Sequence, residues 1–415
     1  MENKDGKMTR TVGLILAGGK GSRLWPLTLR KPTRDDAEAI RQRFQAEMRG
    51  FRKFNRNAVA KPAVPICNRP MIEHSIEQLR SAGVEEIYVN VYTYADSIKK
   101  VLQNGGKFGA RVHYEWTRKI GSGIGNVLLE SLRFLAERRG SQSPDDTLLV
   151  LSGDIISDFN LPDLLAAHLK TEALASIVLH PAQIDKLSRF SSIAVEGGNS
   201  EFSRIISYQH KVPVEQALGR FRNSSIYAFR LGIRSQLAPL FGKANLDISR
   251  DVFPFLAQRG ISFYGYPAGG YWADVGTFGS YFQVHRDALG GKISFGSPGI
   301  SSREEGMKIF PGASFNEPFL MDRDCQVEPG AVVGPFAVIG KHWHLRRASR
   351  VINSVLWGNH ADRRPFILGE GVQLDKCLVG SGDIFENQNG AVLVNNGEEI
   401  AKHELQAKDL EQYEV

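Results

Sequence analysis

The sequence predicts an α/β fold built on a mostly parallel sheet, followed by a C-terminal parallel β-helix. From about residue 11 to residue 290, short apolar runs alternate with segments of helical periodicity, which is typical of strands joined by crossover helices. After about residue 305 the pattern changes to one apolar side chain in every six residues. The chain therefore contains two regions of different architecture.

The strands of the first region are predicted from short apolar runs, and its helices from apolar side chains that share one face. We expect strands at residues 12–16, 87–91, 148–151 and 176–179 and helices at residues 71–82 and 125–138. Parallel sheets bind their ligands at the carboxyl ends of the strands. Residues that directly follow these strands are therefore candidates for a binding site.

The second region carries a six-residue repeat. Positions six residues apart are apolar from Ile309 to Trp357, and the period resumes after a slip of three residues, from Phe366 to Ile384. At a hydrophobic content of 42% a run of this length is not expected by chance. The period is that of a parallel β-helix, in which each coil has three faces and one apolar side chain per face points inward. An antiparallel meander would favour a period of two instead. Glycines punctuate the repeat at Gly330, Gly334, Gly340 and Gly358.

A glycine-rich turn follows the first predicted strand. The strand at 12–16 leads into A-G-G-K-G-S-R, which are residues 17–23. Glycine has no Cβ, so this backbone can bend sharply and bring several N–H groups close to an anion. Arg23 adds a forked, permanently charged group that binds phosphates. The turn is neither a Walker A loop nor a G-x-G-x-x-G dinucleotide site. The alternative without function is a tight turn between a strand and a helix.

Residues 33–60 form a basic segment that interrupts the motif around this turn. The segment has more basic than acidic residues and three phenylalanines, Phe44, Phe51 and Phe54. We interpret it as a tolerated surface insertion, with a basic lid or an effector site for a phosphorylated metabolite as the alternative. One short segment does not support nucleic-acid binding, so we expect no nucleic-acid partner.

When residues 33–60 are removed, V-G-L-I-L-A-G-G-K-G-S-R-L-W-P-L-T-L-R-K-P joins K-P-A-V-P-I-C-N-R-P-M-I-E-H. The joined string closely resembles the opening of the sugar-1-phosphate nucleotidylyltransferases, which form nucleotide sugars. The resemblance implies a Rossmann-like nucleotidyltransferase domain and a C-terminal left-handed β-helix. Together with V-I-N-S-V-L-W, the string looks most like the mannose-1-phosphate guanylyltransferases. It therefore implies GTP and mannose 1-phosphate as substrates, with adenylyl- and uridylyltransferases of glucose 1-phosphate as the alternative.

The resemblance assigns phosphate-binding roles to residues near the glycine turn. Arg23 and Lys61 match the catalytic cations of the family, and Lys31 competes with Lys61 because the insertion separates the two. A lone Lys before Pro is otherwise an ordinary solvated charge. The family pattern places nucleotide binding at Leu16, Ala17, Gly18, Gly19, Gly21, Ser22, Gly121, Ser122 and Gly153.

Two carboxylates are candidates for holding Mg²⁺, which neutralises phosphate charge in such reactions. Asp154 lies in S-G-D-I-I-S-D, where a predicted strand ends, and Asp274 lies in Y-W-A-D-V-G. Both contexts resemble metal-binding motifs of the family, which implies that the two aspartates share one ion. Asp158 is a rival for the metal, and Asp154 could instead cap a helix or form a turn.

The sugar pocket departs from the family pattern. S-Y-Q-H-K-V-P resembles F-x-E-K-P, with His210 in place of the glutamate that binds sugar hydroxyls and Lys211 retained to pair with the sugar phosphate. N-S-S-I-Y resembles N-A-G-I-Y, which keeps Asn223 but replaces glycine with Ser225. In R-F-S-S-I, Ser191 stands where the family has glycine. The chain therefore uses an unusual sugar or, as a hypothesis of another class, is a regulatory subunit that binds nucleotide sugars with weak catalysis.

These assignments divide the chain into a catalytic domain at 1–300, a β-helix at 301–390 and a tail at 391–415. We expect a homo-oligomer formed through the β-helix. The net charge of +7 suits phosphorylated substrates. Three cysteines without metal or redox spacing indicate a reducing, cytoplasmic environment. No apolar run approaches the roughly 20 residues of a membrane helix, so we expect no membrane partner.

Overall fold

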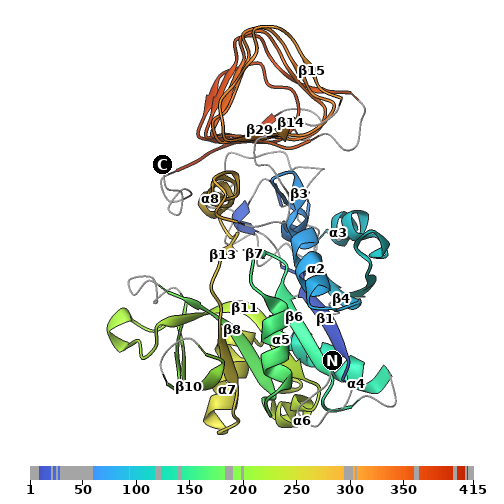
Figure 1. Cartoon of the computed structure of the whole chain (residues 1–415), viewed down its shortest axis with the longest axis vertical. Helices are drawn as coiled ribbons and strands as arrows, with labels where there is room; N and C mark the ends of the chain where they lie inside the picture. Colours follow the sequence, from blue (N-terminus) through green and yellow to red (C-terminus); the bar gives the residue numbers. More distant parts are fainter. Residues whose placement is uncertain are drawn as a thin grey trace. The chain divides into compact units, whose positions relative to one another are not determined.

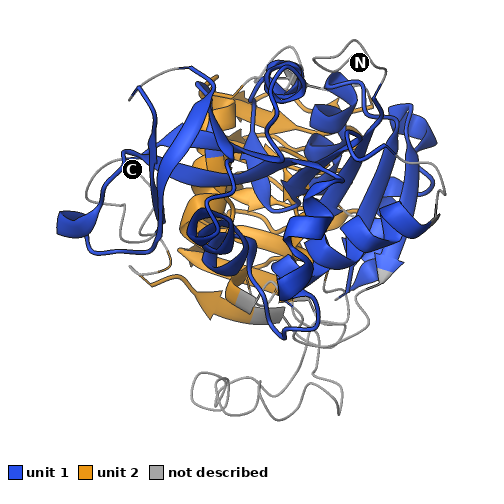
Figure 2. Ribbon diagram, turned by 90° about the horizontal axis from the view of Figure 1, so that it is seen from below, with its two compact units in different colours: residues 1–19, 72–272 blue, residues 20–71, 273–415 orange. Residues whose placement is uncertain are grey.

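The computed structural model describes most of the chain as two compact units (Figures 1 and 2). The first unit contains residues 1–19 and 72–272, and the second contains residues 20–71 and 273–415. The described residues are 9–19, 22–24, 27–28, 59–92, 94–116, 123–138, 143–182, 190–197, 201–293, 302–303, 306–358, 364–395, 400–406 and 409.

The first unit is organised around a nine-stranded mixed sheet with the order β5-β4-β1-β6-β11-β8-β12-β10-β9. The strands β5, β4, β1 and β6 run parallel, whereas β11 pairs antiparallel with both β6 and β8. The four predicted strands are confirmed as β1, β4, β6 and β8. The sheet strands are β1 (Thr11–Leu16), β4 (Glu86–Val91), β5 (Arg111–Trp116), β6 (Thr147–Ser152), β8 (Ala175–Pro181), β9 (Ser191–Val195), β10 (Ser203–His210), β11 (Phe221–Arg230) and β12 (Tyr264–Pro267).

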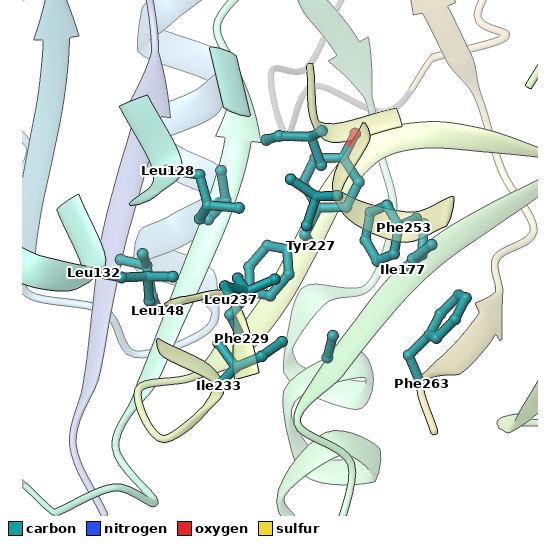
Figure 3. Close-up of a cluster of buried hydrophobic side chains, with 14 of the residues drawn as sticks. Leu128, Leu132, Leu148, Ile177, Tyr227, Phe229, Ile233, Leu237, Phe253 and Phe263 are labelled. Carbon is teal, nitrogen blue, oxygen red and sulfur yellow. The ribbon is translucent and has the colours of Figure 1, made fainter. Parts of the chain in front are cut away.

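Helices pack against this sheet through apolar stripes, and both predicted helices are confirmed as α2 and α4 (Figure 1). Figure 3 shows Leu128 and Leu132 of α4 next to Leu148 of β6, and all three belong to the main buried cluster. Burial of such side chains contributes about 1.5–3 kcal/mol each. The helices are α2 (Met71–Ser81), α3 (Ala95–Leu102), α4 (Ile124–Arg138), α5 (Leu161–Leu169), α6 (Ile233–Gln236) and α7 (Phe253–Gln258), with a π-helix η8 at Ile248–Val252.

Short elements of the second unit lie in the sequence between β1 and α2 and after β12. They are η1 (Ser22–Leu24), η3 (Lys61–Ala63), β2 (Pro65–Ile66), β3 (Arg69–Pro70) and α8 (Phe278–Leu289); β13 (Trp272–Asp274) begins at the unit boundary. Helix α8 begins at a capping box, in which the Thr277 side chain accepts the Ser280 N–H and Ser280 accepts the Thr277 N–H. This pair satisfies two backbone donors that the helix itself leaves without partners.

The C-terminal strands form three parallel sheets that the chain visits in turn, which we call the three-sheet coil. The sheets have the orders β14-β17-β20-β23-β26-β28, β15-β18-β21-β24 and β16-β19-β22-β25-β27, and β29 is added antiparallel to the first. Figure 1 shows their triangular arrangement. The strands are β14 (Ser302–Arg303), β15 (Lys308–Ile309), β16 (Ser314–Phe315), β17 (Phe319–Met321), β18 (Gln326–Val327), β19 (Val332–Val333), β20 (Ala337–Ile339), β21 (Trp343–Leu345), β22 (Arg350–Ile352), β23 (Val355–Leu356), β24 (Phe366–Leu368), β25 (Gln373–Asp375), β26 (Leu378–Ser381), β27 (Gln388–Asn389), β28 (Ala391–Asn395) and β29 (Ile400–Glu404).

The six-residue period is confirmed in the first half of the coil and is wrong in its details after Val351. Each predicted inward residue from Ile309 to Met321 pairs with the one three steps later. Ile339, however, pairs with Leu356 rather than Trp357, and Leu345 pairs with Leu368 rather than Phe366. Corners of different length change the sequence spacing between successive inward residues. The buried stack keeps its register because each coil must cover the apolar side chain below it.

One corner of the coil requires glycine on two successive levels. A Cβ added at Gly340 would lie 2.1 Å from the backbone nitrogen of Gly358, and one added at Gly358 would lie 2.5 Å from the nitrogen of Lys341. Real side chains do not tolerate such distances from backbone atoms, so the two glycines let the coils approach closely. Among the described residues, no helix has the length and apolar character needed to cross a bilayer.

Candidate functional site

The glycine turn and Gly153 lie at the carboxyl ends of neighbouring strands in the first unit. β1 and β6 are parallel, with Leu16 opposite Ser152. The Gly153 N–H donates to the Leu16 carbonyl at 3.0 Å, and the Ala17 N–H donates to the Asn90 carbonyl at 3.0 Å. The structure therefore brings Leu16, Ala17 and Gly153 together where a parallel sheet presents its ligands.

The remaining residues predicted to bind the nucleotide are Gly18, Gly19, Gly21, Ser22, Gly121 and Ser122. Gly18 and Gly19 follow Ala17 in this turn, and a Cβ at Gly19 would meet no heavy atom within 4 Å. Packing therefore does not require glycine at position 19. Gly21, Gly121 and Ser122 lie outside the described residues, as does the side chain of Ser22.

Asp154 lies directly after β6, beside this turn. The Ser152 hydroxyl donates to Oδ1 of Asp154 at 2.6 Å, and the aspartate is half-buried. Its rival Asp158 has a structural contact, because its Oδ1 accepts the Tyr271 N–H at 2.6 Å. Both aspartates thus accept a hydrogen bond through Oδ1, and the choice of Asp154 over Asp158 as a metal ligand stays a prediction.

Arg23, Lys61 and Asp274 come together in the second unit. Nζ of Lys61 lies 3.6 Å from Oδ1 of Asp274. A Cβ added at Gly276 would lie 2.9 Å from Nη2 of Arg23, so the guanidinium packs against the turn that follows Asp274. Lys61 is 7% exposed, whereas Arg23 is exposed. Lys61 thus contacts the carboxylate itself, and Arg23 packs against the turn two residues further along.

The insertion leaves this arrangement intact. The N–H of Val59, near the end of the insertion, donates to the Leu27 carbonyl at 3.2 Å, so the end of the insertion meets the segment that precedes it in a backbone hydrogen bond. A loop whose ends are already joined tolerates added residues at a small entropic cost. The insertion therefore does not displace Lys61. Lys31 and residues 33–58 lie outside the described part of the chain.

The segment that follows Lys61 is anchored to α8 and to the three-sheet coil. The Tyr281 hydroxyl donates to the Pro65 carbonyl at 2.7 Å and accepts from Nε1 of Trp357 at 2.9 Å. Nδ2 of Asn68 donates to the Ile339 carbonyl at 2.9 Å. These contacts join three distant parts of the sequence, and no local pattern indicated them.

On the predicted sugar side, Asn223 is engaged within the protein. Its Nδ2 donates to the Tyr208 hydroxyl at 3.2 Å and to Oγ of Ser249 at 2.9 Å, and its Oδ1 accepts the Ser225 N–H at 2.8 Å. The Ser191 hydroxyl lies 3.1 Å from the Tyr208 hydroxyl. Ser191, one of the residues that departs from the family pattern, therefore belongs to the same polar network as Asn223.

His210 and Lys211 lie at and just after the end of β10. Burial and the Lys211 ammonium lower the pKa of His210, so its imidazole is neutral at pH 7. A neutral imidazole has a single acceptor nitrogen. Lys211 is exposed and has a φ of 51°. Its backbone N–H donates to the Phe190 carbonyl at 3.1 Å.

The loop before α4 packs tightly on the backbone of Leu246. A Cβ at Gly123 would lie 2.0 Å from the Leu246 carbonyl oxygen, and the Gly125 N–H donates to that oxygen at 2.8 Å. Gly123 and Gly125 are thus required by packing, which the sequence did not separate from a role in nucleotide binding. Neighbouring Asp247 caps η8 by accepting the N–H groups of Ser249 and Arg250.

A family model described as nucleotidyl transferase matches residues 12–35 and 57–290. The match covers more than half of the chain, and its break falls inside the predicted insertion. The chain therefore belongs to the nucleotidyl transferase family, among the sugar-1-phosphate nucleotidyltransferases (EC 2.7.7), and the resemblance that the sequence indicated is confirmed.

Two curated relatives and one solved structure show the extent of the similarity. The UTP–glucose-1-phosphate uridylyltransferase of Synechocystis sp. is 26% identical over 378 residues, which span 88% of this chain and 87% of the relative. The mannose-1-phosphate guanyltransferase of Yarrowia lipolytica is 30% identical over 267 residues, or 64% and 60% of the two chains. A crystal structure described as a glucose-1-phosphate thymidylyltransferase from Bacillus anthracis has a TM-score of 0.51 at 21% identity, covering 69% of this chain and 98% of that chain. At this identity the last comparison shows the fold alone.

Proposed function

We propose that this enzyme joins a nucleoside triphosphate and a sugar 1-phosphate into an NDP-sugar and pyrophosphate, with GTP and mannose 1-phosphate as the preferred pair. The observation that carries the proposal is that Lys61 contacts the Asp274 carboxylate and that Arg23 packs against Gly276, two residues further along the chain. Two cations gathered at one short segment are suited to binding a polyphosphate.

In the proposed reaction, a phosphate oxygen of the sugar 1-phosphate attacks the α-phosphorus of the triphosphate. The bond from that phosphorus to the pyrophosphate oxygen breaks, and its electron pair leaves with pyrophosphate. Arg23 and Lys61 hold the triphosphate and stabilise the charge that develops on it. Lys211 binds the sugar phosphate and directs its oxygen toward the α-phosphorus.

The donor set fits Mg²⁺, which prefers one or two carboxylates completed by phosphate oxygens and water. Asp154 and Asp274 are the proposed ligands. Among the described residues no group of three or more His, Cys, Asp and Glu side chains is arranged to hold a metal, so the substrate would supply the remaining ligands. When bound, the ion neutralises phosphate charge and positions the reacting oxygens.

The base and the sugar are inferred from sequence motifs. Relatives in the comparison are named as guanylyl-, uridylyl- and adenylyltransferases. Mannose 1-phosphate and GTP are preferred because of the motifs around Arg23, Lys61 and Trp357. Transfer of the adenylyl group of ATP or the uridylyl group of UTP to glucose 1-phosphate, with release of pyrophosphate, is the alternative.

A regulatory subunit with weak catalysis is the second candidate function. It is favoured by the polar network around Asn223, which uses Nδ2 and Oδ1 for contacts within the protein. An amide engaged in this way has less capacity to bind sugar hydroxyls.

We further propose that residues 1–300 form the catalytic domain, with residues 391–415 as a tail. Residues 301–390, which contain all strands of the three-sheet coil before β28, would be a left-handed parallel β-helix through which the protein forms a homo-oligomer. All three cysteines are free thiols, which suits a reducing, cytoplasmic setting.

The test is to incubate the purified protein with Mg²⁺, each of the four triphosphates and a panel of hexose 1-phosphates, and to follow pyrophosphate release. Turnover with one pair identifies the reaction. Asp154→Asn should abolish this release and leave the fold intact, as judged by circular dichroism. If no pair turns over and a nucleotide sugar still binds, the regulatory function replaces the proposed one.

A further inference from the structure

The guanidinium of Arg222 on β11 is held between two aromatic rings. Its central carbon lies 4.2 Å from the ring centroid of Trp272 and 5.0 Å from that of Phe190. Nε and Nη2 both approach Nδ1 of His180, at 3.2 and 2.9 Å. The position of this arginine is therefore determined by three neighbouring rings.

His180 serves Arg222 as a neutral acceptor. Burial, and then the Arg222 charge, lower the pKa of His180, so its imidazole is uncharged at pH 7. Its Nε2 lies 3.4 Å from the Gly270 carbonyl, a contact that assigns the proton to Nε2 and the lone pair to Nδ1. The histidine thus orients Arg222 without neutralising it.

Arg222 has no counter-ion among the residues that the structure describes. No described carboxylate lies within salt-bridge distance of it, in contrast to Arg230, whose Nη1 lies 3.1 Å from Asp145. Burial lowers the pKa of Arg222 to about 10. A half-buried charge of this kind is costly to maintain unless an anion pairs with it. The guanidinium has five N–H donors, and the imidazole accepts only two of them.

The surroundings indicate which anion would bind. Phe190, whose ring lies beside Arg222, also accepts the backbone N–H of Lys211 through its carbonyl. Asn223 is the next residue along β11, and Nε1 of Trp272 donates to the Ser224 carbonyl at 2.9 Å. The ring that contacts Arg222 therefore belongs to a residue whose backbone also bonds Lys211, the residue proposed to pair with the sugar phosphate.

We propose that Arg222, positioned by His180 and clamped between Phe190 and Trp272, forms an anion site for the phosphate of the sugar 1-phosphate. Its remaining donors would form charge-assisted hydrogen bonds to two phosphate oxygens, as a forked guanidinium does. The choice of the sugar phosphate rests on the proposed function, whereas the binding of a phosphate does not.

The experiment measures binding to the full-length protein by titration calorimetry in the absence of metal. The probes are inorganic phosphate, mannose 1-phosphate, glucose 1-phosphate and ATP. Arg222→Met retains the length and apolar character of the stem, and Arg222→Lys retains the charge without the fork. Arg220→Met is the matched control, because Arg220 is exposed and its loss changes the net charge equally.

We expect Arg222→Met to weaken the binding of inorganic phosphate and of a sugar 1-phosphate by about tenfold or more. The affinity of Arg222→Lys for both probes should lie between that of Arg222→Met and that of the wild type. Arg220→Met should bind all four probes as the wild type does. The affinity of Arg222→Met for ATP should also equal that of the wild type. Without phosphate, Arg222→Met should unfold at the same or a higher temperature than the wild type, because an uncompensated charge has been removed. Added phosphate should raise the unfolding temperature of the wild type more than that of the variant.

Unchanged phosphate and sugar-phosphate affinity in Arg222→Met would overturn the proposal, particularly if this variant is less stable without phosphate. A loss of ATP affinity alone would assign the anion to the nucleotide and overturn the choice of the sugar phosphate. If phosphate binding depends on Arg222 but no substrate pair turns over, the anion site stands and the proposed reaction fails.

Discussion

Lys61 and Asp274 come from opposite ends of the catalytic region of the sequence, yet Nζ of the lysine lies 3.6 Å from Oδ1 of the aspartate. The lysine is 7% exposed, and the N–H of Val59, two residues before it, donates to the Leu27 carbonyl. A buried ammonium next to a carboxylate is positioned before any substrate arrives. This preorganisation makes the pair suitable for binding charge that develops during a reaction.

Replacing Lys61 should therefore affect the chemical step more than the fold. We expect Lys61→Met to lower kcat by about 10²–10³-fold in the pyrophosphate-release assay. Methionine fills a similar volume, so the unfolding temperature should stay close to that of the wild type. Lys170→Met, at an exposed position after α5, is the control. A Lys61→Met enzyme with full kcat would contradict the catalytic assignment.

The contact between Gly276 and Arg23 predicts a second effect on activity. The Cβ of Gly276→Ala would lie 2.9 Å from Nη2 of Arg23 and push the guanidinium away from the turn. We expect kcat to fall by about 10–100-fold, the cost of displacing a catalytic group by about 1 Å. Stability should change little, since an exposed side chain can move.

Gly269→Ala is the matched control for this variant, because a Cβ at Gly269 would meet no heavy atom within 4 Å. Both variants are assayed together for pyrophosphate release and thermal unfolding. Equal kcat values for Gly276→Ala and Gly269→Ala would show that the position of Arg23 beside the turn does not matter for activity.

Ser225 is strained, because it has a φ of 64°, in the left-handed region that favours glycine. Glycine removes the steric cost of this conformation, about 1–2 kcal/mol, and loses about 0.5–1 kcal/mol through the entropy of the unfolded chain. We therefore expect Ser225→Gly to raise the free energy of unfolding by about 0.5–1 kcal/mol in urea titrations. Ser225→Ala retains the strain and should show no gain. The same increase in both variants would rule out the backbone explanation.

His168 is buried, and burial followed by the charge of Arg230 lowers its pKa to about 3 from an ordinary value of 6.5. Between these two pH values the unfolded chain binds a proton that the folded protein does not bind. The free energy of unfolding contributed by this group is fully present above pH 6.5 and falls by about 1.4 kcal/mol per pH unit below it.

His168→Asn removes this titration and retains a polar partner for Ser176, whose hydroxyl lies 2.7 Å from Nδ1 of His168. Denaturant unfolding at pH 8 and pH 5 measures the effect. The wild type should lose more stability than the variant between these values, since all other groups are common to both. Parallel pH profiles would mean that His168 titrates in the folded protein as it does in the unfolded chain.

The secondary structure around the site could be predicted because its signals are local. The run Val12–Leu16 forms β1, and the segment at 125–138 lies within α4. The antiparallel insertion of β11 between β6 and β8 could not be predicted, because strand pairing depends on residues far apart in the chain. Trp357 was likewise predicted to point into the buried stack of the coil. Leu356 pairs with Ile339 there instead, and the Trp357 indole donates to the Tyr281 hydroxyl.

The candidate site was predictable to the extent that it rests on motifs. Arg23, Lys61 and Asp274 were named from short strings, and the structure brings these three together within the second unit. Asn223 was named in the same way, but its engagement with Tyr208 and Ser249 was not foreseeable. Arg222 attracted no attention in the sequence, because an arginine without a counter-ion is recognised only when its neighbours in space are known.

By itself the sequence determined which segments are strands and helices, the six-residue repeat and the nucleotidyltransferase family, because periodicity and motifs are properties of neighbouring residues. Only the tertiary structure decided that Val59, near the end of the insertion, meets Leu27, that Lys61 is buried against Asp274, and that Arg222 lies between Phe190 and Trp272. These relationships arise from long-range packing and charge burial, which depend on distances in space and have no local sequence signature.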